Sequence, residues 1–203
     1  MKIIGITGGI GSGKSTIVRE LASRGYAIYD CDSHAKRLIV SRASIRQQII
    51  ALLGEEAFLP GEEADTYRYN TSYVSQLVFS NPQLLQQLNS IIHPALAEDI
   101  QVASQEHELL FVEAAILYEA GWDSLCDTIF LIDAPEEVRL SRTLARDYQS
   151  EVTDNNISKV RARMRAQNAS HIIETKAKKK PIVLMNDGSQ SIEELANQII
   201  RCL

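Results

Sequence analysis

Cysteine is scarce in this chain of 203 residues: there are three, far apart, at Cys31, Cys126 and Cys202. No two of them form a Cys-x-x-Cys pair, and an odd number cannot all pair within the chain. The sequence therefore indicates neither a disulfide framework nor a zinc site. We expect reduced thiols, as in the cytosol.

Long apolar runs and an excess of positive charge are also lacking. No stretch reaches the ~18 apolar residues of a membrane span, and Gly8 ends the first apolar run too early for a signal peptide. The formal net charge is −5, with 21 basic against 26 acidic residues, whereas general nucleic-acid binders are basic. We expect a cytoplasmic protein that binds neither membranes nor nucleic acid. The sequence does not indicate an oligomeric state.

What the chain does have is an alternation of short apolar runs with long helical patterns. The runs lie at residues 3–7, 26–29, 109–112 and 128–132, with a weaker one at 181–184. Such runs are typical of buried strands, and the helices between them are typical of a parallel sheet covered on both faces. The sequence predicts an α/β fold.

The stretch from residue 33 to residue 108 differs, because it contains helical patterns and no convincing strand. Residues 55–69 are polar and indicate a loop. Pro82 and Pro94 each stand where a helix would begin. We expect an all-helical insertion in the α/β fold.

One motif indicates the ligand. Gly8–Ser15 matches G-x-x-x-x-G-K-[ST] at every specified position, and it follows a buried strand and opens a helix, as a phosphate loop must. Glycines let successive backbone N–H groups turn toward a phosphate, and the helix presents its positive end to the same anion. Lys14 is expected to reach the β- and γ-phosphates, and Ser15 to bind Mg²⁺. The predicted fold is thus a P-loop NTPase-type sheet flanked by helices.

Acidic residues follow two of the other predicted strands. Asp30 and Asp32 close the second run, and Glu113 closes the third, where parallel strand ends line the ligand crevice. A carboxylate there can accept a proton or help to hold a metal. Simpler roles stay open: Asp30 and Asp32 are suited to cap a helix, and Glu113 to form a salt bridge.

Arginines gather late in this acidic chain. Arg139, Arg142 and Arg146 fall on one helical face, and Arg161 and Arg165 share another. Phosphoryl transfer needs cations over the migrating group, supplied when a mobile segment closes over it. The pattern indicates a helical lid with a hinge between the two helices, or else two solvated basic helices.

Taken together, these blocks resemble the dephospho-CoA kinase family. The residues that carry the resemblance are Thr7–Thr16, Asp30–Asp32, Val78–Phe79, Leu88–Asn89, Ile92–Pro94, Glu113–Glu119, Arg142, Arg146–Asp147, Arg163–Gln167, Asn186–Gly188 and Ile192–Leu195. The phosphate loop alone is shared by many activities, and the order of the other blocks makes the match specific. The chain departs from the family at Ala115, where proline is common, and in a longer, basic stretch at 175–180.

The resemblance implies that ATP, with Mg²⁺, phosphorylates the 3′-hydroxyl of dephospho-CoA in the last step of coenzyme A synthesis. It implies a core at 1–32, 109–138 and 169–203, a helical substrate-binding insertion at 33–108 and a lid at 139–168. Asp32, Lys14 and Arg142 would be catalytic, His93 and Asp32 would bind the acceptor, and Ser15 and Glu113 would hold the metal. The nucleotide would be bound by Gly8, Gly11, Ser12, Gly13, Lys14, Ser15, Thr16, Arg146 and Asn186.

Two other functions share part of this pattern. A nucleoside monophosphate or shikimate-type kinase shares the loop, the sheet and the lid, and the insertion with His93-Pro94 distinguishes this chain from it. A GTP-dependent switch needs an Asn-Lys-x-Asp element to read guanine, and the sequence has none.

Overall fold

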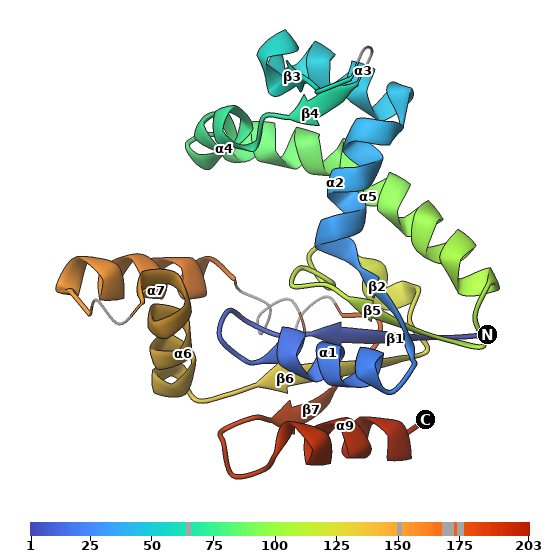
Figure 1. The fold of residues 1–203 in the computed structure, drawn as a ribbon, viewed down its shortest axis with the longest axis vertical. Coiled ribbons are helices and arrows are strands. Elements are labelled where there is room, and N and C mark those ends of the chain that lie inside the picture. The colour runs from blue at the N-terminus through green and yellow to red at the C-terminus, as the bar shows by residue number, and fades with distance from the viewer. Residues whose placement is uncertain (64–65, 150–151, 168–172, 174–176) are drawn as a thin grey trace. The chain divides into compact units, whose positions relative to one another are not determined.

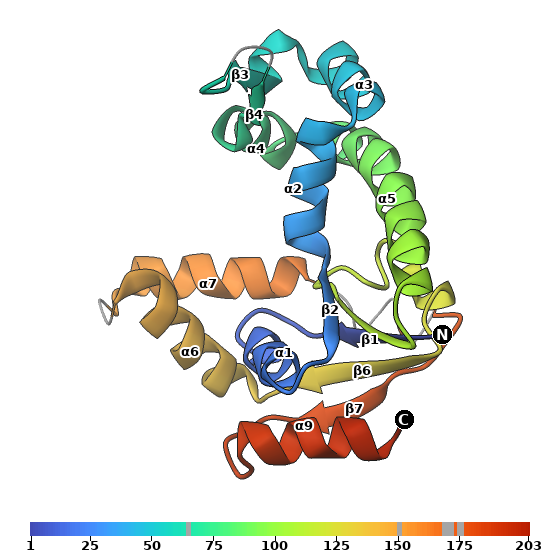
Figure 2. The ribbon, with the colours of Figure 1, turned by 45° about the vertical axis from the view of Figure 1, so that its right-hand side comes forward.

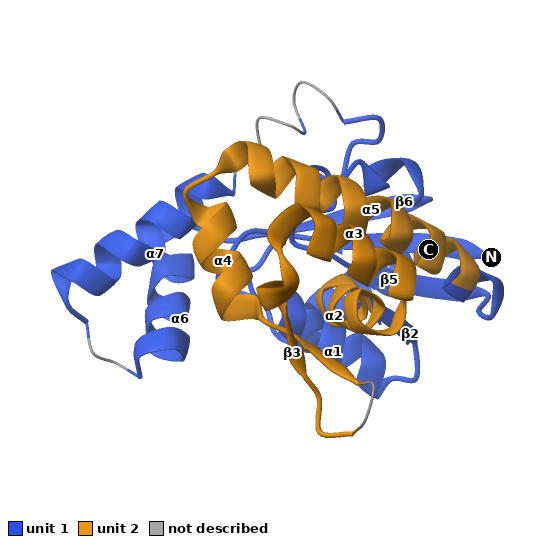
Figure 3. Ribbon diagram, turned by 90° about the horizontal axis from the view of Figure 1, so that it is seen from above, with its two compact units in different colours: residues 1–29, 103–203 blue, residues 30–102 orange. Residues whose placement is uncertain are grey.

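The structure, a computed structural model, describes residues 1–63, 66–149, 152–167, 173 and 177–203. The chain forms two compact units (Figure 3). The first unit combines residues 1–29 with 103–203, and the second comprises residues 30–102.

A five-stranded sheet forms the centre of the first unit (Figure 1). Its order is β2-β5-β1-β6-β7, and β1 pairs in parallel with both β5 and β6, as β6 does with β7. The bounds are Lys2–Thr7 for β1, Ala27–Asp30 for β2, Leu109–Glu113 for β5, Thr128–Asp133 for β6 and Ile182–Met185 for β7. All five runs expected to be strands are strands.

Helices α1 (Lys14–Ser23) and α9 (Ile192–Arg201) pack together and share one apolar core with the sheet. That core includes buried residues of β1, β5, β6 and β7, such as Ile4, Phe111 and Phe130. Two more helices, α6 (Glu136–Tyr148) and α7 (Asp154–Ala166), pack on each other through a separate small apolar cluster (Figure 2). A 3₁₀ turn, η2 (Trp122–Ser124), lies between β5 and β6.

The second unit is mainly helical but contains a short hairpin. Its elements are α2 (Cys31–Ser41), α3 (Ala43–Leu53), η1 (Glu55–Ala57), β3 (Phe58–Pro60), β4 (Tyr67–Tyr69), α4 (Thr71–Phe79) and most of α5 (Pro82–Gln105). β3 and β4 pair antiparallel, so the prediction of an all-helical insertion with a loop at 55–69 was wrong. Strands of three residues are too short to give an alternating pattern, and this pair is held instead by contacts such as the Phe58 and Tyr69 rings, 5.6 Å apart.

The second proline of this unit does not begin a helix. α5 starts at Pro82, as expected, but runs on through Pro94 to Gln105. Pro94 is exposed, whereas Leu88, Leu96 and Ile100 of the same helix are buried. Packing of that buried face compensates for the hydrogen bond that an internal proline removes.

The limits of the second unit, 30 and 102, differ by a few residues from the insertion expected at 33–108. The expected boundary between lid and core, at residues 168 and 169, lies outside the described residues, as do the first two residues, 175 and 176, of the basic stretch at 175–180. Among the helices that the structure describes, none is both long and apolar enough to cross a membrane.

Candidate active site

The phosphate loop connects β1 to α1 and is shaped by two glycines with positive φ. Gly11 has φ +78° and Gly13 has φ +88°, conformations that side chains strongly disfavour. The Ser12 N–H donates to the carbonyl oxygen of Gly9 at 3.1 Å, which closes a turn at the tip of the loop. The loop is thus a defined structure and not an open glycine-rich linker.

The start of α1 suits an anion. Its N-cap, Gly13, supplies no side-chain hydrogen bond, and the first turn has no acidic residue, so the positive end of the helix is not compensated locally. The Ser12 hydroxyl is buried and has no hydrogen-bond partner among the described residues. Thr16, on the exposed side, accepts a bond from Arg19 at 3.3 Å. A phosphate here would give the Ser12 hydroxyl an acceptor and would meet the positive end of the helix.

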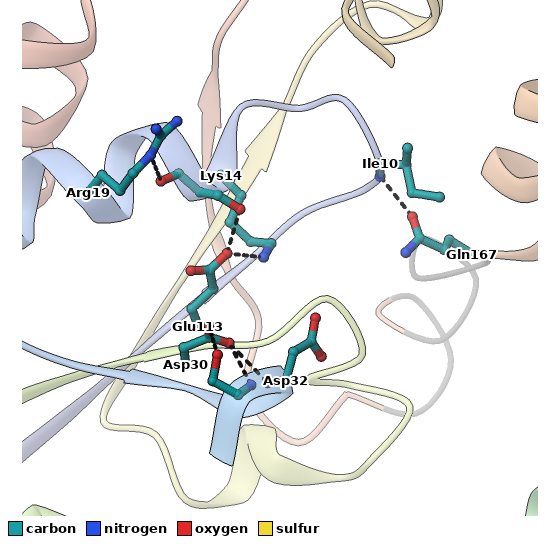
Figure 4. A network of polar contacts seen from close by, with 9 residues as sticks. Ile10, Lys14, Arg19, Asp30, Asp32, Glu113 and Gln167 are labelled. Atoms are coloured by element: carbon teal, nitrogen blue, oxygen red, sulfur yellow. Dashed lines mark hydrogen bonds and ion pairs between the residues drawn. The ribbon is translucent and has the colours of Figure 1, made fainter. Parts of the chain in front are cut away.

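Three of the predicted site residues meet at one oxygen atom (Figure 4). The Lys14 ammonium forms an ion pair with Oε1 of Glu113, and the Ser15 hydroxyl donates to the same oxygen at 2.8 Å. Glu113 ends β5 directly beside Ile6 of β1, and this register brings its carboxylate to the loop. The side chains of Lys14 and Glu113 are only 13% and 12% exposed. The two residues expected to hold a metal therefore lie together.

Asn186 supports the loop from β7. Its backbone N–H donates to Asp133 at 2.7 Å, and its side-chain Nδ2 donates to the Ser12 carbonyl at 2.8 Å. Asn186 is only 3% exposed. Asn186, one of the residues expected to bind the nucleotide, therefore holds the loop in its conformation through these hydrogen bonds.

The two arginines chosen from the sequence have different surroundings. Arg142 donates to the Asn186 carbonyl at 2.9 Å and lies close to Gly13. Arg146 instead pairs with Asp147 at 2.7 Å, as does Arg163 of α7. These hydrogen bonds lower the pKa of Asp147 to about 2. Within the described residues, Arg142 contacts a support of the loop and Arg146 does not.

Sequence reasoning missed two residues that touch the loop. The Arg139 Nε donates to the Ile10 carbonyl at 3.0 Å. The Gln167 side chain accepts the Ile10 N–H at 2.8 Å (Figure 4). Arg139 had been noted only as one of three arginines on a helical face, and Gln167 only as the end of the Arg163–Gln167 block of the resemblance, and nothing in their spacing distinguished them from their neighbours. Arg139 also lines a cavity of about 150 Å³ with Arg161 and Arg165, in which Arg161 is paired with Glu136.

In the second unit, Asp30 at the end of β2 and Asp32 at the start of α2 have different surroundings. Asp30 is the N-cap of α2: its carboxylate accepts from Asp32 N at 2.9 Å and from the Ser33 hydroxyl at 2.7 Å. The Asp32 side chain is exposed and has no hydrogen bond or ion pair among the described residues. Capping therefore accounts for Asp30 and leaves Asp32 available for chemistry.

His93 lies on α5 of the second unit and is partly buried. Burial lowers the pKa of its imidazole below the usual 6.5, which favours the neutral form. A neutral imidazole can both donate and accept a hydrogen bond. Within the described chain, no three His, Cys, Asp or Glu side chains gather as a metal site.

A parallel sheet whose first strand leads through a lysine-containing phosphate loop into a helix defines a phosphate-loop nucleotide-binding protein. Residues 2–191 match the profile of one family, dephospho-CoA kinase (CoaE), and the chain belongs to that family.

Individual relatives agree with this. The chain is 41% identical to a dephospho-CoA kinase of Porphyromonas gingivalis over 75% of this chain and 74% of the relative. It is 34% identical to one of Salinibacter ruber over 93% and 90%.

Solved structures share the fold of this chain. The protein TT1252 from Thermus thermophilus is 34% identical, with a TM-score of 0.75 over 99% of this chain and 96% of that one. A shikimate kinase from Acinetobacter baumannii, 15% identical with a TM-score of 0.52 over 100% and 92%, shares the fold alone.

Proposed function

We propose that the phosphate loop, Asp32 and the arginine-bearing α6 carry out one reaction, the transfer of the γ-phosphate of ATP to the 3′-hydroxyl of dephospho-CoA. The chain is an ATP-dependent phosphotransferase with an alcohol acceptor, and it phosphorylates dephospho-CoA in the synthesis of coenzyme A. The observation that carries this function is the family match over residues 2–191, in a chain whose Lys14 and Ser15 are both in place.

The loop is the donor half of the site. Gly8, Gly11 and Gly13 allow the backbone to lie close to the phosphates, and Ser12 and Thr16 contribute hydroxyl groups there. Lys14 releases Glu113 and follows the negative charge of the β- and γ-phosphates as the bond to the leaving oxygen breaks. A cation at this position stabilises the charge that develops on the phosphates as the bond breaks.

Ser15 and Glu113 are the residues that would hold Mg²⁺, Glu113 directly or through water. Both offer oxygen, which Mg²⁺ prefers, and Mg²⁺ in phosphate-transfer sites commonly uses few protein ligands. The hydrogen bond between them supports this assignment because it places the Ser15 hydroxyl and Oε1 of Glu113 only 2.8 Å apart. When bound there, the ion neutralises phosphate charge.

The acceptor half comes from the second unit, which we propose binds the pantetheine-bearing substrate. Asp32 acts as the base that takes the proton of the attacking hydroxyl, and its lack of a described partner supports this role. His93, as a neutral imidazole, would hydrogen-bond the acceptor.

The remaining residues act on charge and orientation. Arg142 stabilises the transferring phosphate from beside Gly13, and Arg146 would reach the nucleotide only after leaving Asp147. Asn186 contributes to nucleotide binding by shaping the loop. The 139–168 lid and the cytoplasmic location stay predictions.

A panel of acceptors tests the function. Purified protein is given labelled ATP with dephospho-CoA, shikimate or a nucleoside monophosphate, and transferred label is counted. We expect label on dephospho-CoA, at the 3′ position. Transfer to shikimate or a nucleoside monophosphate in its place would favour the alternative of another small-molecule kinase, whose fold this chain shares.

A further inference from the structure

Ile10, at the tip of the phosphate loop, is held by α6 and α7 at three points. Its N–H donates to Oε1 of Gln167 at 2.8 Å, and its carbonyl accepts from Nε of Arg139 at 3.0 Å. Its side chain packs against the cluster in which α6 meets α7, formed by Leu140, Leu144, Val160 and Met164. Thus both peptide groups and the side chain of one loop residue are fixed from outside the loop.

These contacts act on a turn. Residues 9–12 form a β-turn closed by the bond from Ser12 N to Gly9 O, and φ of +78° at Gly11 is the value that a type II turn requires at its third residue. Types I and II differ by the orientation of the central peptide. Here the central peptide joins Ile10 to Gly11, and its carbonyl is the one bound by Arg139.

Arg139 therefore determines where the Gly11 N–H points. In a trans peptide the C=O and N–H groups point in opposite directions. Because the Ile10 carbonyl is turned to Arg139, the Gly11 N–H is turned to the other side of the turn. The Ile10 N–H, in contrast, is bound to Gln167 and is not free for a phosphate. The expectation that successive N–H groups all turn inward fails at Ile10.

Gly11 itself packs directly against α6, with no room for a side chain. A Cβ on Gly11 would lie 2.3 Å from the Arg139 carbonyl oxygen and 2.7 Å from the Thr143 hydroxyl. The Thr143 hydroxyl in turn donates to that same carbonyl at 2.8 Å. The turn is thus seated directly on the backbone of α6.

We propose that Gln167 and Arg139 are positioning residues, which hold this turn in the form that directs the Gly11 N–H at the bound nucleotide. ATP affinity then depends on the contacts of Arg139, on α6, and Gln167, at the end of α7, with Ile10. Neither side chain has to touch the phosphate. The inference rests on the proposed nucleotide-binding role of the loop and adds two residues to it.

The test measures ATP affinity by calorimetry on the full chain without an acceptor. Gln167→Met keeps the length of the side chain and its lack of charge but removes the acceptor. Arg139→Met removes the donor, and Arg139→Lys keeps its charge while removing Nε. Gln105→Met, at the exposed end of α5, is the matched control.

We expect Gln167→Met to raise the Kd for ATP roughly five- to tenfold, the scale of one neutral hydrogen bond, and Arg139→Met to raise it at least as much, because its bond is charge-assisted. The KM for dephospho-CoA stays unchanged, and amide exchange at Ile10 becomes faster in Gln167→Met. In the double variant the Kd for ATP rises by less than the product of the two single effects, because both residues hold the same loop residue, Ile10. If the bond from Nε to the Ile10 carbonyl matters more than the positive charge, the Kd for ATP rises as much in Arg139→Lys as in Arg139→Met.

Two results would overturn the proposal: an ATP Kd within twofold of wild type in Gln167→Met, or a KM for dephospho-CoA that rises as much as the Kd for ATP. A thermal melt of each variant checks folding, and Arg139→Lys carries the test if Gln167→Met does not fold. Failure of the proposed function is a separate outcome: wild type would then bind ATP but transfer nothing to dephospho-CoA.

Discussion

The side chain of Asn186 lies so close to the backbone of Gly13 that no other residue fits there. The Asn186 Nδ2 donates to the carbonyl of Ser12, and a Cβ on Gly13 would lie 2.2 Å from that nitrogen. Gly13 also has φ +88°. Two separate constraints, one on backbone conformation and one on space, therefore require glycine at the start of α1.

Gly13→Ala and Gly25→Ala separate these two constraints. Gly25 has the same φ of +88°, but nothing lies within 4 Å of the position of its Cβ. We expect Gly25→Ala to lower the free energy of unfolding by about 1–2 kcal/mol, the cost of a left-handed backbone for alanine. Gly13→Ala should lower the free energy of unfolding by more than this, as measured by urea unfolding. It should also weaken ATP binding, as measured by calorimetry. Equal losses of stability in both variants would mean that Asn186 moves aside freely.

Asp32→Asn should lower kcat by roughly 10²–10⁴-fold while leaving the Kd for ATP nearly unchanged, because a general base acts in the chemical step. Asp30→Asn is the matched control, since asparagine caps helices as well as aspartate does. It should retain its activity and its melting temperature. If Asp30→Asn lost as much turnover as Asp32→Asn, the assignment of the base to Asp32 would be wrong.

Glu113→Gln should raise the Mg²⁺ concentration needed for half-maximal rate by roughly tenfold or more, the usual scale for weakening a metal site. Without Mg²⁺, nucleotide binding should not weaken, because Lys14 loses its competing ion-pair partner. Titration of the rate with Mg²⁺ measures the first effect and calorimetry the second. Glu108→Gln, an exposed acid just before β5, should change neither. An unchanged Mg²⁺ requirement in Glu113→Gln would leave Glu113 a partner of Lys14 only.

Acid should destabilise the α6–α7 pair through Asp147. Hydrogen bonds from Arg146 and Arg163 lower the folded pKa of Asp147 from 3.8 to about 2. Its contribution to stability is therefore complete above pH ~4 and is lost as the pH falls from about 4 to about 2. The urea midpoint of Asp147→Asn should depend less on pH than that of wild type across this window. Parallel curves for the two proteins would contradict this.

The thiols should differ sharply in reactivity. Cys31 and Cys126 are buried and Cys202 is exposed, and burial raises the pKa of the Cys126 thiol to about 12. Iodoacetamide at pH 8 should label Cys202 in the native protein, and Cys126 only after denaturation, because the thiolate is the reactive form. Peptide mass spectrometry measures the labelling. Rapid native labelling of Cys126 would indicate local opening around η2.

The hairpin and the long α5 mark where local patterns stopped being informative. Phe58–Pro60 and Tyr67–Tyr69 are too short to show a period, and Pro94 has the local signature of a helix start. In both places tertiary packing decided the conformation against the local signal. The five sheet strands were predictable because each is a longer apolar run closed by turn or polar residues.

The sequence by itself determined the phosphate loop, the strand before it and the helix after it, because glycine conformation, the lysine and the apolar run are all local properties. The strand pattern indicated Glu113 and the family resemblance indicated Asn186 as site residues, but the sequence determined neither the contacts that these side chains make nor that Gln167 reaches the loop. Glu113, Asn186 and Gln167 are 98, 174 and 157 residues away from their partners Ser15, Ser12 and Ile10. The strand order β5-β1-β6-β7 and the packing of α6 on α7 bring them there. Spacing along the chain carries no trace of such contacts, since they form only when separate elements pack side by side.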